Sequence, residues 1–306
     1  MRKISLFILL LLSVSGAAEY SPGTIGFQFL RTSVGARPAG MGGAFIAIPG
    51  DVHGIYYNPA GLSYVEQPQA TFTYHNHLLD LNSGFIGATH PVKGVGVLGY
   101  GVLYMDYGKF DKTDIDGQRL GDFGANSIAL STSLSRTIWK NVSIGVSGKY
   151  IRAAIESYSS DALATDLAMM VGFPSQDLYF AAGYYNLGTT LSAFVEHKDP
   201  LPAHFRVGFS KRLAHLPLLF SFNLYKFDQE QWHGSVGGEF TLSNHVLFRI
   251  GYDHIGQEMQ VGTSKDRLAG AALGFGFLYK QYRIDYALTH MGELGTVNRF
   301  TLSGQF

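Results

Sequence analysis

Apolar and polar residues alternate one by one along several stretches of the chain. In residues 142–151, the sequence VSIGVSGKYI places valine, isoleucine and tyrosine on one face and serine, glycine and lysine on the other. The same alternation recurs in residues 127–135, 204–210, 246–253 and 282–289. A period of two residues is that of a β-strand, not of a helix. The pattern predicts strands with one apolar face and one face of small or polar residues.

Fourteen such segments can be counted, and the links between them alternate in length. Short links such as WKN and SNH alternate with mostly longer ones, and the longest predicted links are residues 110–124 and 189–201. Bacterial outer-membrane barrels have short periplasmic turns and longer external loops. We therefore predict an all-β fold, a 14-stranded antiparallel transmembrane β-barrel over residues 67–306 with periplasmic termini. The predicted strands begin near Gln69, Ser83, Gly94, Ala125, Val142, Asp161, Leu178, Pro202, Pro217, His233, His245, Arg267, Gln281 and Thr296.

Composition agrees with a lipid-facing wall. Charged residues make up only 15% of the 306 residues, whereas soluble proteins average about 25%. The alternative is a secreted β-sandwich, whose strands also alternate. A sandwich does not readily explain why the 18 Tyr and 22 Phe gather near strand ends, where membrane barrels carry aromatic girdles.

The first 18 residues have the plan of a secretory signal peptide. Arg2 and Lys3 precede an apolar run of residues 4–14, and small residues follow up to Ala18. The run is shorter than the about 20 residues that a membrane-spanning helix needs.

The formal net charge of zero does not indicate binding to nucleic acid, and the absence of Cys excludes disulfides and a lipoprotein anchor. We expect export to the outer membrane of a Gram-negative-type cell, with outer-membrane lipid as a partner.

The last predicted strand ends on an aromatic residue. Phe300, Leu302 and Phe306 fall on its apolar face. Such a strand resembles the signal read by the barrel assembly machinery. We expect these residues to be an assembly signal and that machinery to be a partner.

Residues 19–66 do not alternate. They contain closely spaced glycines, two interior prolines and many apolar side chains. A linker is the alternative, but the apolar content is too high for a solvated tether. We predict that residues 19–66 form a hatch or plug, inside the barrel or at its periplasmic mouth.

Charged residues on the polar faces of the strands are expected to point into the lumen, because a charge facing lipid costs about 2 to 4 kcal/mol at the bilayer midplane. Opposite charges on neighbouring strands would stiffen the wall and bind the hatch, with Arg37 meeting Glu239, Asp253 or Asp285. The alternative is a selectivity surface in an open channel. The predicted lumen charges are Lys149, Arg206, Glu239, Arg249, Asp253, Arg283, Asp285 and Arg299.

Other candidate chemistry is sparse. His75 and His77 have a spacing that can bind metal, but no third ligand lies nearby in the sequence. No catalytic motif is present, so we predict neither an enzyme nor a cofactor or metal site.

The predicted loop at residues 110–124 carries acidic residues at alternate positions. It lacks the closing Glu of a calcium loop, and a solvated loop is the simpler reading. Because it is the longest predicted external link, we expect it to contact a partner protein. The candidate residues are Asp111, Asp114, Asp116 and Arg119.

The stretch GARPAGMGGAFIAIPGDVHGIYYNPAGLSYV resembles the N-terminal signature of the PorV/PorQ family of outer-membrane proteins, which is related in architecture to the FadL fatty-acid transporters. Further stretches, such as LPAHFRVGFSKRLAHLP and KDRLAGAALGFGF, are more similar to PorQ than to PorV. The residues that match the hatch motif are Gly35, Arg37, Gly40, Gly42, Gly43, Asn58, Pro59 and Ala60.

The resemblance implies a FadL-like barrel with an N-terminal hatch, associated with type IX secretion. A PorQ-like member would help to anchor a cell-surface attachment complex with PorZ-like and PorU-like partners. The second hypothesis is a FadL-like transporter or channel for hydrophobic or small solutes. A charged, glycine-lined lumen favours the first hypothesis.

Overall fold

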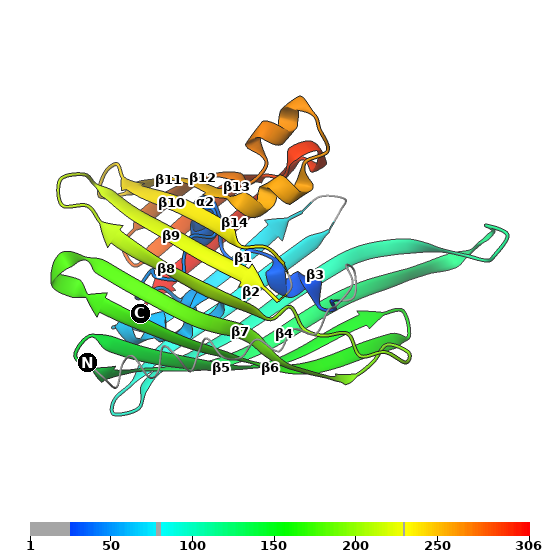
Figure 1. Ribbon diagram of the computed structural model, residues 1–306, viewed down its shortest axis with the longest axis horizontal. Helices are drawn as coiled ribbons and strands as arrows, with labels where there is room; N and C mark the ends of the chain where they lie inside the picture. Colours follow the sequence, from blue (N-terminus) through cyan, green and yellow to red (C-terminus); the bar gives the residue numbers. More distant parts are fainter. Residues whose placement is uncertain (1–24, 78–80, 229) are drawn as a thin grey trace.

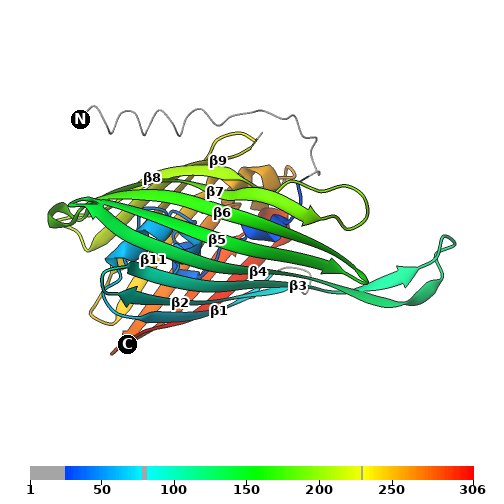
Figure 2. The same ribbon diagram turned by 90° about the horizontal axis from the view of Figure 1, so that it is seen from below.

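The computed structural model describes residues 25–77, 81–228 and 230–306, so the predicted signal peptide at residues 1–18 lies outside the described residues. Fourteen antiparallel strands close into a barrel in which β1 pairs with both β2 and β14 (Figures 1 and 2). The strands are β1 Gln69–Asn76, β2 Asn82–Val92, β3 Gly96–Thr113, β4 Arg119–Trp139, β5 Val142–Ile155, β6 Tyr158–Phe173, β7 Leu178–Ser192, β8 His204–Arg212, β9 Leu218–Phe227, β10 His233–Thr241, β11 Val246–Asp253, β12 Ala271–Tyr279, β13 Tyr282–His290 and β14 Thr296–Gln305.

The predicted all-β transmembrane barrel is confirmed, and the alternation sorts side chains between its outer and inner faces. On β1, Phe72 is 53% exposed on the outer face, whereas Thr71 and Thr73 are buried inside. On β5, Ile144 and Val146 point outward and Ser143 and Ser147 inward. The apolar outer surface suits contact with lipid. Within the described residues, no helix is both long and apolar enough to traverse a bilayer.

Most predicted strand starts lie within a few residues of the observed ones, but one predicted loop is wrong. Residues 110–124 are not a loop: β3 runs on to Thr113 and β4 begins at Arg119, so only residues 114–118 turn. The ladder persists because Phe110 stacks on Phe123, with ring centroids 5.4 Å apart. Register shifts after Asp106 and after Lys112 interrupt the alternation and conceal these strands in the sequence. The β3–β4 hairpin projects far beyond the rest of the barrel (Figure 1).

A second difference concerns the link between β11 and β12. The predicted strand start near Arg267 falls instead in a short helix, because residues 254–270 form a long loop with the 3-10 helices η4 (His254–Met259) and η5 (Ser264–Leu268). Asp266 stabilises this loop by accepting hydrogen bonds from the backbone N–H groups of Val261, Gly262 and Thr263. The side-chain pattern of such a loop is not periodic, so its length was not predicted.

The barrel has a short-turn end and a long-loop end. The C-terminal end lies with the short turns, where the Phe306 N–H donates to the Pro68 carbonyl over 2.8 Å (Figure 1). The β3–β4 hairpin and the 254–270 loop lie at the opposite end. This arrangement matches the predicted alternation of short periplasmic turns at one end with longer external loops at the other.

Residues 25–66 run inside the barrel, and we call them the inner segment. They comprise η1 (Gln28–Arg31), α2 (Ala36–Gly40), α3 (Gly54–Tyr57) and η2 (Pro59–Tyr64). Helix α2 packs against β11 to β14, whereas η2 packs against β3 to β6. Buried apolar side chains on the segment include Leu30, Met41, Phe45, Ile55 and Leu62. The segment therefore fills the space between opposite walls of the barrel (Figure 1).

Candidate functional site in the barrel interior

The Gly-rich motif lets the inner segment turn sharply and lie directly on the wall. Gly35 has a φ of 82°, and a Cβ there would stand 2.4 Å from the His53 ring. Gly42 has a φ of 62°, and a Cβ there would stand 2.5 Å from the Tyr252 backbone N. Gly43 also has a positive φ, and Gly40 lies against the backbone of Gly274 on β12. No other residue type would permit this contact without a shift of the backbone.

Glycines on the wall receive the segment from the other side. A Cβ on Gly251 of β11 would stand 2.1 Å from the Gly42 backbone N. A Cβ on Gly145 of β5 would stand 2.2 Å from the Ala60 backbone N. These close approaches of backbone to backbone leave no room for a side chain between the segment and the wall at either point.

The Asn-Pro-Ala motif has a structural role. The Asn58 Oδ1 accepts a hydrogen bond from the Ala60 N–H over 2.9 Å, and its Nδ2 donates to the Ile46 carbonyl over 2.6 Å. Pro59 occupies the first turn of η2, where its missing N–H costs nothing. The Ser135 hydroxyl on β4 donates to the Ala60 carbonyl over 3.1 Å. The motif thus starts η2 and ties it to the wall.

Three Arg and three acidic residues close a ring of ion pairs between the inner segment and strands β10, β11 and β13. The six alternate in sign around the ring, so it has no net charge when all are ionised. Its contacts are Arg37–Glu239 at 2.7 Å, Glu239–Arg249 at 2.7 Å, Arg249–Asp285 at 2.7 Å, Asp285–Arg283 at 2.7 Å, Arg283–Asp51 at 3.1 Å and Asp51–Arg37 at 2.7 Å. We refer to these six residues as the ionic ring.

The ionic ring compensates for charges that are removed from solvent. Arg249 and Asp285 have fully buried side chains, and Asp51 is 3% exposed. Burial raises the pKa of Asp51, but Arg283, His53 and Arg37 together outweigh burial and hold that pKa well below its ordinary value. The His53 Nδ1 also lies 2.6 Å from the Asp51 Oδ1. Removing one member would leave its partners buried and incompletely paired.

The remaining predicted lumen charges face inward, but they do not join the ring. Lys149 pairs with Asp166 of β6 at 2.7 Å, and Arg206 lies over the Tyr225 ring. Arg299 donates to the Thr289 hydroxyl over 2.8 Å.

Of the three acidic partners considered for Arg37, only Glu239 pairs with it directly. Asp285 belongs to the same ring but contacts Arg249 and Arg283. Asp253 instead accepts a hydrogen bond from the Tyr225 hydroxyl over 2.6 Å. Both acids are therefore within the interior but away from the Arg37 guanidinium.

Sequence reasoning missed Asp51, His53 and Asp166. Asp166 shares the polar face of β6 with Ala162 and Ala164. The alternation of side chains along that strand could therefore have assigned Asp166 to the lumen. Asp51 and His53 lie in the irregular inner segment, where no period assigns a side chain to a face. Asp51 pairs with Arg283, which lies 232 residues away in the sequence, as well as with Arg37 and His53 nearby.

His75 and His77 lie together at the loop end of β1. Both rings contact one hydroxyl, since the Ser83 Oγ lies 3.0 Å from the His75 Nδ1 and 2.7 Å from the His77 Nε2. Burial, and then the Arg299 charge, lower the pKa of His77 to about 4. These interactions explain the pair by packing and hydrogen bonding.

A pocket of about 510 Å³ lies at the loop end between the inner segment, the 254–270 loop and strands β11, β13 and β14. Met259, Met291 and Val297 give it an apolar part, and Arg31 and Arg299 give it a charged part. The mouth of a β-barrel is a common place for a ligand site.

The β3–β4 hairpin uses most of its charges internally. The Asp114 Oδ1 accepts hydrogen bonds from the N–H groups of Asp116 and Gln118, and Arg119 pairs with Asp111 and Asp122. The hairpin also exposes large apolar side chains, since Ile115 is 101% and Leu120 is 62% exposed.

The residues predicted as an assembly signal point outward from β14. Phe300, Leu302 and Phe306 are 52%, 50% and 63% exposed. This places them on the outer face of the wall, and their recognition by an assembly machinery stays a prediction.

The chain matches no protein-family model and no curated protein sequence. Its structure is similar to a FadL homologue of Pseudomonas aeruginosa, with a TM-score of 0.58 and 12% identity over 90% of this chain and 98% of that chain. It is also similar to the toluene transporter TodX of Pseudomonas putida, with a TM-score of 0.59 and 12% identity over 89% and 96% of the two chains. The CymD monoaromatic hydrocarbon channel gives a TM-score of 0.59 and 12% identity over 92% and 99%. At this identity the likeness establishes the fold, a FadL-like barrel of fourteen strands.

Proposed function

We propose that this protein is an outer-membrane barrel of PorV/PorQ type whose lumen is closed by the inner segment, and that it anchors partner proteins of type IX secretion at the cell surface. PorZ-like and PorU-like proteins are the partners that the sequence resemblance implies. The projecting β3–β4 hairpin is the single observation that carries the anchoring role. The barrel places this hairpin at the long-loop end, away from the short periplasmic turns.

The hairpin has the features of a protein-binding element. Its ladder, the Phe110–Phe123 stack and the Arg119 ion pairs hold it extended. Ile115 and Leu120 stand exposed on it, and the hairpin projects beyond the rest of the barrel (Figure 1). Exposed apolar groups on a polar, projecting element favour contact with a protein.

The filled interior also supports a holding role over a conducting one. The ionic ring and the backbone contacts at Gly251 and Gly145 fix the inner segment to opposite walls. Opening a wide passage would break buried ion pairs, which is costly.

A second candidate function is transport of a small apolar solute. The pocket at the loop end favours it, because Met259, Met291 and Val297 offer an apolar lining. The similar structures include a toluene transporter and a monoaromatic hydrocarbon channel. The charged groups Arg31 and Arg299 in the same pocket suit a purely hydrocarbon ligand less well.

Affinity purification from the native host tests the anchoring role. The tagged full chain would be compared with the double variant Ile115→Ser, Leu120→Ser, and with the control Leu216→Ser, Leu242→Ser. Leu216 and Leu242 are 56% and 62% exposed in the short turns at the opposite end. We expect type IX attachment proteins with the wild type and the control, and their loss with the hairpin variant. Equal recovery with all three chains, or no such protein with the wild type, would contradict the proposal.

A further inference from the structure

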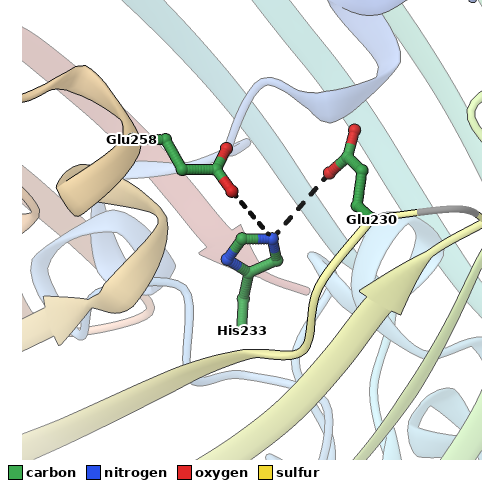
Figure 3. Close-up of side chains that lie close together, drawn as sticks. All are labelled: Glu230, His233 and Glu258. Atoms are coloured by element: carbon green, nitrogen blue, oxygen red, sulfur yellow. Dashed lines mark ion pairs between the residues drawn. The ribbon is translucent and has the colours of Figure 1, made fainter. Parts of the chain in front are cut away.

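One histidine and two glutamates converge at the loop end of the barrel (Figure 3). Glu230 lies in the link between β9 and β10, His233 begins β10, and Glu258 lies in η4 of the 254–270 loop. The His233 Nε2 lies 3.8 Å from the Glu230 Oε2 and 3.4 Å from the Glu258 Oε1. One ligand atom from each of the three residues lies within 4.8 Å of the others.

The environment of His233 lacks the hydrogen bonds that a buried imidazole normally makes. Its side chain is 2% exposed, and neither ring nitrogen has a hydrogen-bond partner among the described residues. The two carboxylate oxygens are too distant, because charge-assisted N–H···O bonds measure about 2.7 to 2.9 Å. A buried polar group without a partner is rare enough to require an explanation.

We propose that Glu230, His233 and Glu258 bind a divalent transition-metal ion, with Zn²⁺ as the ion best suited to them. Zn–N and Zn–O distances of about 2.0 to 2.2 Å place neighbouring tetrahedral ligand atoms roughly 3.3 to 3.6 Å apart. The Glu258 separation from the His233 Nε2 already falls in that range, and the Glu230 separation exceeds it slightly. An ion between the three atoms would give the imidazole nitrogen its missing partner.

The ligand set selects against the hard cations. Ca²⁺ and Mg²⁺ prefer all-oxygen sites, whereas imidazole suits Zn²⁺ and its neighbours in the first transition row. Two carboxylates compensate the charge of a divalent ion. Glu258 is 54% exposed, so the fourth coordination position faces solvent and can hold water.

Glu230 already makes a second contact, which the ion would share. The Arg31 guanidinium of the inner segment donates to both Glu230 oxygens, over 2.8 and 2.7 Å. Each carboxylate oxygen has a further lone pair for a metal. The ion would therefore link the 254–270 loop to the β9–β10 link and, through Glu230 and Arg31, to the inner segment. Glu258 and Arg31 both line the pocket at the loop end, so the ion would fix one side of its mouth.

Isothermal titration of the metal-stripped full chain in detergent with Zn²⁺ alone tests the site. We expect one saturable Zn²⁺ per chain, and visible absorption typical of a low-coordinate site when Co²⁺ replaces Zn²⁺. Glu258→Gln should weaken Zn²⁺ binding by more than about 100-fold, because removal of an outer-shell partner alone costs about 10- to 100-fold. His233→Gln should do the same, whereas Ca²⁺ should not compete.

The matched control is Glu196→Gln, an exposed glutamate in the β7–β8 loop. Its Zn²⁺ affinity should equal that of the wild type. Because Glu258 is largely exposed, Glu258→Gln is expected to fold even if His233→Gln does not. Absence of saturable binding by the wild type, or unchanged binding by Glu258→Gln, would overturn the proposal.

Discussion

Arg37 of the inner segment and Glu239 of β10 are joined by two parallel hydrogen bonds, from Nε to Oε2 over 2.8 Å and from Nη2 to Oε1 over 2.7 Å. This bidentate pair connects a residue of the Gly-rich motif to a strand 202 positions away in the sequence. Arg37 reaches Asp51 with its third nitrogen, so one side chain ties together two parts of the inner segment and the wall. The pair therefore links the Gly-rich motif of the inner segment to the barrel wall.

Arg37→Gln should destabilise the folded barrel strongly. Removing one partner of a buried ion pair leaves the other uncompensated, which costs about 3 to 5 kcal/mol. The free energy of unfolding would be measured by urea titration of the chain in lipid vesicles. The control is Arg212→Gln at the exposed end of β8, which should change that free energy by no more than about 0.5 kcal/mol. Similar values for the two variants would contradict the role of the ionic ring.

Asp51 should make the protein less stable in acid. Its pKa in the folded state lies well below the ordinary value of 3.8, because Arg283, His53 and Arg37 outweigh burial. A lowered folded pKa stabilises the protein above the unfolded pKa, and that stabilisation is lost as the pH falls through the folded pKa. We expect the urea midpoint to fall as the pH drops below about 4, and to fall less steeply in Asp51→Asn. The exposed Asp177→Asn variant should show the same fall of the urea midpoint with pH as the wild type. If the fall is reduced equally in both variants, the acid sensitivity does not come from Asp51.

Gly251→Ala should disturb the fit between the inner segment and β11. The added Cβ would stand 2.1 Å from the Gly42 backbone N, where neither backbone can easily give way. Overpacking of this kind costs about 1 to 3 kcal/mol. Gly148→Ala is the control, because a Cβ there meets nothing within 4 Å on the outer face of β5. Urea midpoints measured side by side should fall only for Gly251→Ala, and equal midpoints would show that the contact at Gly42 is loose.

The strands could be predicted because a barrel wall imposes one rule on every residue. Ile144 faces outward and Ser143 inward for the same reason at every strand, namely lipid outside and a narrow interior within. The rule held for Glu239, Arg249 and Asp285, whose inward orientation followed from parity alone.

The rule does not apply where no lipid sorts the side chains. The β3–β4 hairpin extends past the wall, so Asp111 and Arg119 need not alternate, and the sequence pattern there predicts a loop where the structure has strands. The inner segment has no period, so Asp51 could not be placed beside Arg283, although it lies 3.1 Å away. Glu230 lies in the β9–β10 link, His233 begins β10 and Glu258 lies in the 254–270 loop, and the pairing of β10 with β11 brings them together.

Conductance in a planar lipid bilayer tests the central claim, a barrel closed by its inner segment, most directly. The full chain would first be shown to be folded by its resistance to unfolding in detergent before heating. It would then be reconstituted into the bilayer. We predict no steady ion conductance, because the ionic ring and the wall glycines hold the inner segment in the lumen. A steady conductance from the wild-type chain would contradict it and favour the solute channel.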